Sequence, residues 1–348
     1  MARIEPKNML TPAYKLTIGK KLVDTTQEPK ASTVTELRVE LDMDAPADRL
    51  LLVLGQVNGL KPATDDQAIV ELGYADDTGG LQQVITGSVV TVEPGLTTNR
   101  VVAHTAAHTL LRSFTDKTFE SKTAGEIVQE LCSDASVDVE QADDGISFPA
   151  YVVDGRRNFF RHMSDLADLC GFDLYFNSHG KLVFQKFQSG NNLHTFEFAK
   201  HVVELKVVRE PALAESVQAF GESPTSTQGE SSTFWLTKDF SNSKGSAGSG
   251  SPELLLERSA LRTSDAAQTA ADSAEKEIQR RTLRGWVLAL GRPQVQLGDA
   301  IKFQSMPDST LNTTFQVRSV VHSITKYGGF TTRVGFRAID TTPAAPGL

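Results

Sequence analysis

The segment Arg318-Ser-Val-Val-His-Ser-Ile-Thr-Lys-Tyr-Gly-Gly-Phe-Thr-Thr-Arg-Val334 is similar in sequence to an earlier segment of the chain. From Ser88 to Val101 the chain reads Ser-Val-Val-Thr-Val-Glu-Pro-Gly-Leu-Thr-Thr-Asn-Arg-Val. Valine and threonine suit a pleated strand and glycine suits a tight turn, so each copy predicts a β-hairpin. Two such hairpins at opposite ends of the chain indicate a duplicated β-domain. The alternative is a chance similarity between two hairpins of common composition.

Bulk composition narrows the class of protein. The chain has 348 residues, 39% of them hydrophobic and 22% charged, which is ordinary for a globular protein of two to four domains. A formal charge of −8 argues against a nucleic-acid-binding surface. No apolar run has the length of a membrane span or of a signal peptide, so we expect synthesis in the cytoplasm and no membrane partner. Cys132 and Cys170 are expected to be reduced, buried thiols.

Periodicity divides the chain into a mainly β protein with α+β insertions. Alternating apolar residues predict a first β-domain over residues 13–112, closed as a barrel or a sandwich, and a second one over 191–221 and 285–340. The remaining segments are an N-terminal arm over 1–12, an α+β insertion over 113–190, a flexible loop with a helix over 222–284, and a tail over 341–348. The second β-domain is therefore predicted to be split by the loop and the helix.

Local signals support the two insertions. Thr123-Ala-Gly-Glu126 is a capping-box pattern that predicts a helix start, and a second helix is predicted to end at Gly171. The Gly- and Ser-rich tract over 241–251 predicts a flexible loop that exchanges its amide hydrogens freely, with an alanine-rich helix following it. The whole loop is predicted over 221–252, and its apolar island Phe234, Trp235 and Leu236 is a strand or a contact for a partner.

No residue set in the sequence indicates catalysis. His104 and His108 have the spacing of a helical zinc site, but Thr105 stands where the general-base glutamate is needed. The neighbouring valines favour a strand, which would hold the two histidines far apart in structural roles. Nothing resembles a nucleophile motif or a phosphate-binding loop, and the acidic pairs lie in turns. We therefore predict no enzymatic activity and no cofactor.

Several ordered motifs resemble those of phage tail hub proteins, namely the late control gene D family and the hub portion of the VgrG spikes of type VI secretion. They are Gly87-Ser-Val-Val-Thr-Val, the segments Phe119 to Leu131 and Leu166 to Tyr175, Gly291-Arg-Pro-Gln-Val-Gln-Leu-Gly-Asp-Ala-Ile-Lys-Phe303, Phe315-Gln-Val-Arg-Ser-Val-Val-His322 and Gly328-Gly-Phe-Thr-Thr332. The resemblance covers residues of about 80–340. It singles out Gly87, Gly298, Asp299, His322, Gly329 and Phe330 as structural signature residues.

The resemblance implies a structural role in a baseplate. In that family one chain holds two β-barrels similar to the tail-tube protein, and three chains imitate a six-fold ring. The implied partners are two further copies of the chain, a tail tube or tube-initiator ring, a separate trimeric spike and the baseplate wedge proteins, within a phage or a phage-derived contractile injection system. The competing functions are a tail-associated cell-wall hydrolase and a carbohydrate-binding β-module.

Overall fold

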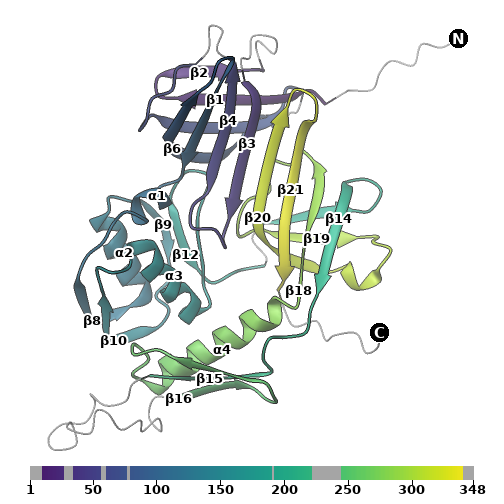
Figure 1. Cartoon of the computed structure of the whole chain (residues 1–348). Helices are drawn as coiled ribbons and strands as arrows, with labels where there is room; N and C mark the ends of the chain where they lie inside the picture. Colours follow the sequence, from purple (N-terminus) through teal and green to yellow (C-terminus); the bar gives the residue numbers. More distant parts are fainter. Residues whose placement is uncertain are drawn as a thin grey trace, which may run out of the picture.

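The computed structural model describes residues 10–26, 34–55, 60–76, 79–189, 192–221 and 244–339 (Figure 1). Strands account for 49% of the structure and helices for 16%, which confirms the prediction of a mainly β fold with helical insertions. Pro12, which was assigned to the N-terminal arm, already begins the first strand. The predicted contact Phe234, Trp235 and Leu236 and the tail over 341–348 lie outside the described residues.

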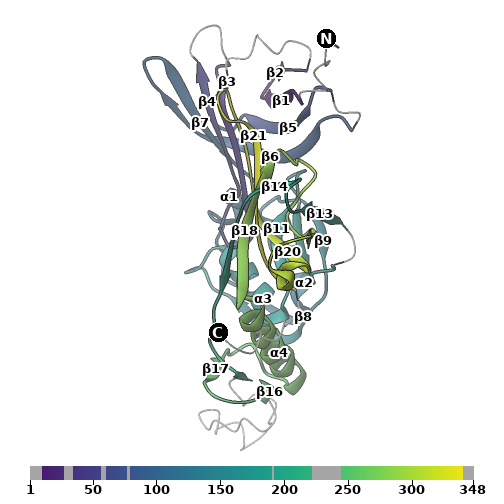
Figure 2. The ribbon, with the colours of Figure 1, turned by 90° about the vertical axis from the view of Figure 1, so that its right-hand side faces the viewer.

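A single 13-stranded sheet runs through most of the molecule (Figures 1 and 2). Its strands are β1 (Pro12–Ile18), β2 (Lys21–Asp24), β3 (Val34–Asp42), β4 (Arg49–Gly55), β5 (Gln67–Tyr74), β6 (Gln82–Pro94), β7 (Thr98–His104), β13 (Leu193–Glu197), β14 (Val202–Arg209), β18 (Leu283–Leu290), β19 (Ala300–Gln304), β20 (Thr314–Thr325) and β21 (Gly329–Ala338).

This sheet contains the same arrangement of six strands twice. The first unit pairs its strands in the order β1-β5-β6-β7-β4-β3, and the second pairs them in the order β13-β19-β20-β21-β18-β14. Each strand occupies the same place in chain order within its unit, so β3 corresponds to β14 and β6 to β20. One pairing differs, because β1 runs antiparallel to β5 whereas β13 runs parallel to β19. We call these the first and second six-strand units.

The register of the strands aligns the two units residue by residue. The ladder between β3 and β4 has a bulge between Val34 and Glu36, and the ladder between β14 and β18 has one between Val202 and Glu204. The bulges place Glu36-Leu-Arg-Val39 in correspondence with Glu204-Leu-Lys-Val207. A bulge inserts one residue and re-aims the strand, so its occurrence at matching places supports a common design.

The two hairpins that suggested the duplication do occupy equivalent strands, but their first strands are offset. Val92 pairs with Val101, nine positions later, whereas Val320 pairs with Val334, fourteen positions later. The second hairpin is therefore longer by five residues. Structural register aligns Ser319 with Thr91 rather than with Ser88, because the bulges follow Val89 and Val317.

The first insertion packs helices against short strands. It comprises α1 (Ala107–Leu110), β8 (Lys117–Thr123), α2 (Ala124–Asp134), β9 (Val139–Ala142), β10 (Ser147–Val153), α3 (Phe159–Cys170), β11 (Asp173–Phe176) and β12 (Leu182–Gln185). Thr123 and Glu126 form both hydrogen bonds of the predicted capping box. Gly171 ends α3 in the left-handed region, at a φ of +66°.

The structure of the second insertion shows that two predictions were wrong, namely the assignment of residues 216–220 to the second β-domain and the flexible loop over 241–251. Strand β15 (Ser216–Phe220) was assigned to the second β-domain, but it pairs with β16 (Lys244–Gly248) and β17 (Glu253–Glu257) in a separate sheet against α4 (Ser264–Arg280). The tract predicted as a flexible loop therefore includes a strand. A Cβ on Gly245 would lie 2.3 Å from the carbonyl of Ala267, so glycine here permits close packing of the strand on the alanine-rich helix. A short 3-10 helix (Ser309–Leu311) completes the described helices.

Candidate assembly interface

The two histidines with zinc-like spacing form no metal site in the described residues. They lie closer than predicted, with stacked rings 6.0 Å apart, because β7 ends at His104 and α1 returns His108 towards it. Nδ1 of His104 is 3.0 Å from the carbonyl oxygen of Asp48. No group of three or more possible metal-ligating side chains occurs in the described part of the chain.

Gly298 and Asp299 build a turn that fixes the start of β19. Gly298 has a φ of +81°, and Asp299 accepts the N–H of Gln296 at 2.8 Å through its carboxylate. The same carboxylate lies 2.8 Å from Nε2 of His194, at the start of β13. The carbonyl of Asp299 accepts the N–H of Val317 at 2.9 Å. These contacts give the two signature residues a structural role.

The first six-strand unit contains the same turn without the glycine. Asp65 takes the left-handed conformation, at a φ of +68°, and the Asp66 carboxylate accepts the N–H of Ala63 at 2.8 Å. The carbonyl of Asp66 accepts the N–H of Val89 at 2.8 Å. This equivalence could not be read from the sequence pattern, because Asp65-Asp66 stands in place of Gly298-Asp299. Aspartate is one of the few side chains that tolerate the left-handed region.

The other signature residues lie elsewhere. His322 is completely buried, with Nδ1 2.9 Å from Oγ1 of Thr332, and its ring packs 6.1 Å from that of Phe330. Burial lowers the pKa of His322 to about 3, so the ring is neutral. Gly329 has a φ of +66° at the end of the hairpin turn. Gly87 lies on β6 of the first six-strand unit, where a Cβ would be 2.3 Å from the carbonyl oxygen of His104. The structure thus distributes the signature over several structural positions.

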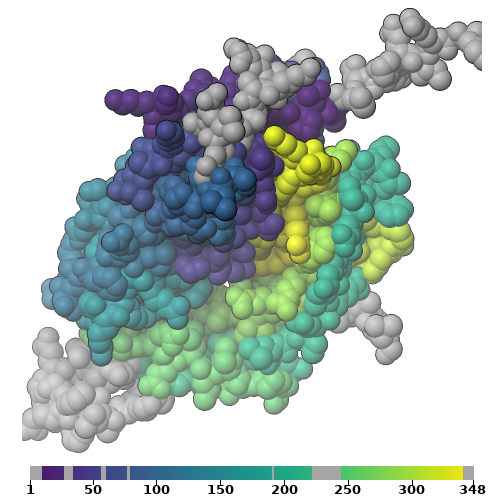
Figure 3. All heavy atoms as spheres, turned by 45° about the horizontal axis from the view of Figure 1, so that its top comes forward, coloured from purple at the N-terminus to yellow at the C-terminus, as the bar shows by residue number. Residues whose placement is uncertain are grey.

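The two six-strand units join at one seam, where β3 pairs antiparallel with β20. Asp42 lies opposite Ser319 and Glu36 lies opposite Thr325. The N–H of Met43 donates to the carbonyl of Arg318 at 3.0 Å. In Figure 3 the yellow β20–β21 hairpin lies against the purple surface of the first unit.

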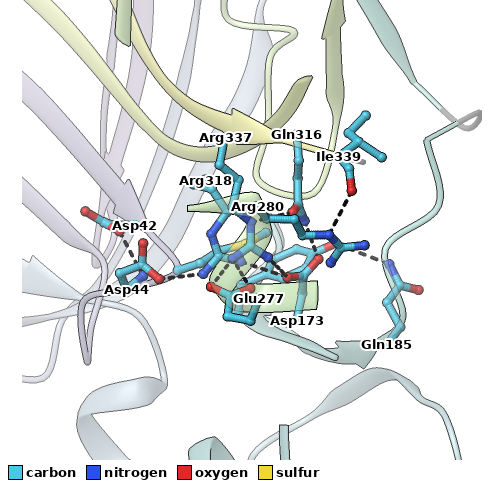
Figure 4. A network of polar contacts seen from close by, with 12 residues as sticks. Asp42, Asp44, Asp173, Gln185, Glu277, Arg280, Gln316, Arg318, Arg337 and Ile339 are labelled. Atoms are coloured by element: carbon cyan, nitrogen blue, oxygen red, sulfur yellow. Dashed lines mark hydrogen bonds and ion pairs between the residues drawn. The ribbon is translucent and has the colours of Figure 1, made fainter. Parts of the chain in front are cut away.

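A buried polar network fastens both insertions beside this seam (Figure 4). Arg318, on the bulge of β20, donates to Asp173 of β11 at 2.8 Å. Arg337 of β21 binds Glu277 of α4 and donates to Gln316 at 2.9 Å. Burial raises the pKa of the Asp173 carboxyl, against the opposing effect of the two arginines. The network lies in the wall of a cleft of about 1680 Å³.

Four strands of the main sheet, β2, β13, β14 and part of β6, have an edge without a partner among the described strands, and two of these edges correspond to the two sides of the β3–β20 seam. Strand β14 pairs only with β18, and none of its residues is buried. Strand β6 pairs with β5 as far as Ser88, and from Thr91 to Pro94 it pairs only with β7. Exposed edges present free N–H and C=O groups to any strand that approaches. These edges are therefore the candidate sites for assembly.

Comparison with known proteins identifies the fold. No protein-family model matches the sequence, and no curated protein does. The 43 kDa tail protein of prophage MuSo2 from Shewanella oneidensis has a similar structure, with a TM-score of 0.69 and 14% identity over 94% of this chain and 98% of that one. A tail protein from Neisseria meningitidis MC58 has a TM-score of 0.70 and 10% identity over 94% and 97%. The chain has the fold of phage tail proteins.

A protein of type VI secretion also has a similar structure. The E. coli c3393 protein, described as a type VI secretion component with structural similarity to the T4 tail proteins gp27 and gp5, has a TM-score of 0.60 and 12% identity. The alignment covers 96% of this chain and 80% of that one. The resemblance stated from the motifs is thus confirmed at the level of fold. None of the described helices is long and apolar enough to cross a membrane.

Two features of this tail-protein fold escaped the sequence analysis. The Glu-Leu-Arg-Val and Glu-Leu-Lys-Val segments at 36–39 and 204–207 were a readable signal of duplication. The polar network left no such signal, because Asp173 and Arg318 are 145 positions apart and belong to different elements.

Proposed function

We infer that this chain is the hub of a phage tail or of a phage-derived contractile injection system. It acts as a non-enzymatic homotrimer that connects a six-fold tail tube, or a tube-initiator ring, to a trimeric spike and contacts the baseplate wedge proteins. The observation that carries this proposal is the presence of two six-strand units with the same strand order in one chain.

The geometry favours a trimer for a simple reason. A ring of three chains contains six six-strand units, so it can match a six-fold tube on one face and a three-fold spike on the other. Closed cyclic symmetry is also the usual solution for soluble homo-oligomers. The similar proteins are named as tail proteins and as a type VI secretion component, which supports a structural role in a phage-tail-like particle.

The copy number of the chain in its particle tests the proposal. The chain would be tagged in its native particle, and quantitative mass spectrometry would compare its abundance with those of the tube and spike proteins. We expect three copies per particle, equal to the number of spike chains. Six copies, or a number that follows tail length, would contradict the hub function. Hydrolysis of purified cell wall by the isolated chain would favour the hydrolase alternative instead.

A further inference from the structure

We propose that the outer edge of β14 pairs with the free edge of β6 in a second copy of the chain, in the register that β3 and β20 show within one chain. This inference rests on the proposed trimeric hub and names the surfaces that close it. The seam seen once inside the molecule would then recur between molecules.

The duplication provides the template. Strand β3 of the first unit pairs with the part of β20 that lies beyond β19. Strand β14 corresponds to β3, and the part of β6 beyond β5 corresponds to that part of β20. Each chain therefore holds one completed seam and two unpaired halves of the same seam. Joining the halves head to tail generates a ring when the rotation closes.

Burial distinguishes the paired strands from the unpaired ones. Leu37 and Val39 of β3 are 0% exposed. The corresponding Leu205 and Val207 of β14 are only half-buried. Val320 of β20 is also 0% exposed, whereas its counterpart Val92 is half-buried. The partial exposure of apolar side chains on both edges is what a missing neighbour strand would produce.

The template also predicts the register. Because Asp42 lies opposite Ser319, Glu210 would lie opposite Thr91 of the second copy, and Val208 would lie opposite Glu93. Lys206 would then be a diagonal neighbour of Glu93 on the same face of the sheet, within reach of an ion pair. Glu210 would be the other diagonal neighbour of Glu93, and Arg100 of the same chain already lies 3.2 Å from the Glu93 carboxylate, so the register adds one cationic neighbour to an existing ion pair.

Pro94 makes the intermolecular seam shorter than the internal one. It corresponds to His322 of β20, and proline has no N–H to donate. The hairpin that follows it is also five residues shorter than its counterpart. Proline on an exposed edge limits uncontrolled strand pairing. The weaker seam would keep free subunits from aggregating and leave closure to the complete ring.

Disulfide trapping tests the register with an internal control. The variant carrying Glu93→Cys and Val208→Cys places thiols across the proposed seam, and the variant carrying Glu40→Cys and Val321→Cys places them at the equivalent positions of the existing seam. The Met43 to Arg318 hydrogen bond makes Glu40 and Val321 a non-hydrogen-bonded pair, with Cα atoms about 4.5 Å apart, a separation that permits a disulfide. Both native cysteines are buried and free.

Each variant would be oxidised as the purified chain and in assembled particles. We expect the first variant to yield a covalent trimer as its largest product and the control variant to yield a cross-linked monomer. Either single substitution alone should yield no covalent trimer. Products larger than a trimer would overturn ring closure. A trimeric chain in the particle that does not cross-link would overturn this seam and leave the hub function standing. A chain that is not trimeric in the particle would overturn both.

Discussion

Among single residues, the buried His322 is expected to make the stability of the folded chain depend on pH. Its folded pKa of about 3 lies below the ordinary value of 6.5, so only the unfolded chain takes up a proton as the pH falls between these values. The contribution of the neutral ring to stability is full above pH 6.5 and falls by about 1.4 kcal/mol per pH unit below it.

Denaturant unfolding of the wild type and His322→Gln between pH 7.5 and 4.5 measures this loss. We expect the free energy of unfolding of the wild type, relative to the variant, to decline on that slope below pH 6.5. Comparison with the variant removes the opposite effect of Asp48, whose pKa burial raises to about 7. A difference that is constant with pH would contradict the neutral, buried imidazole.

Gly298 and Gly329 form a matched pair for substitution by alanine. Both have positive φ, but a Cβ on Gly298 would lie 2.6 Å from the Tyr175 hydroxyl, whereas one on Gly329 would meet nothing within 4 Å. We expect Gly329→Ala to cost about 1 kcal/mol of unfolding free energy through backbone strain, and Gly298→Ala to cost about 3 kcal/mol because a steric clash is added. Equal losses by thermal or chemical unfolding would show that the turn relaxes around the hydroxyl.

At the scale of elements, the sequence patterns predicted those features whose interacting residues lie close together in the chain. The capping box at Thr123 and the two Val/Thr-rich hairpins were readable because their partners are close in the chain. Strand β15 was misassigned because its partners are β16, which lies within the Gly- and Ser-rich tract, and β17, which follows that tract. Register and bulges also escaped prediction, since they depend on which strand lies opposite. The similarity of the two hairpins therefore identified the equivalent strands correctly, but it aligned their first strands three residues out of register.

Hydrogen exchange tests the corrected assignment of β16. The N–H of Ser246 donates to the Gln268 side chain at 3.1 Å, so the amides of Gly245 and Ala247 point towards β15. We expect both amides to exchange at least about 100-fold more slowly than in an unstructured peptide. Gln268→Ala should release Ser246 while sparing its two neighbours. Exchange of Gly245 and Ala247 at the rate of free peptide would return this segment to the flexible loop first predicted.

The unequal seams lead to a prediction for Pro94→Thr. Threonine restores an N–H at an edge position that is followed by an exposed turn, so each intermolecular seam gains one possible hydrogen bond, worth about 1 kcal/mol. We expect subunit association, measured by sedimentation, to strengthen by about fivefold per seam. Glu93→Lys should weaken it by placing a cation beside Lys206, and adding Lys206→Glu should reverse that part of the loss, while the lost ion pair between Glu93 and Arg100 of the same chain is common to both variants. Unchanged association in all three variants would show that these edges do not meet.

At the scale of the whole molecule, the sheet crosses from one six-strand unit into the next without a break. The network of Asp173, Arg318, Glu277 and Arg337 holds both insertions beside the crossing point. Removing one member of a buried charged network leaves the others unpaired, which is costly. The two insertions are therefore attached to the sheet beside the β3–β20 seam.

We propose that three copies of this duplicated sheet close a six-fold ring around the tail axis. Electron microscopy of the intact particle, reconstructed without imposed symmetry, tests it most directly. We expect six six-strand units around an axial channel, with three β3–β20 seams alternating with three β14–β6 seams. Six copies of the chain, copies placed away from the axis, or a ring in which β14 and β6 do not meet would contradict it.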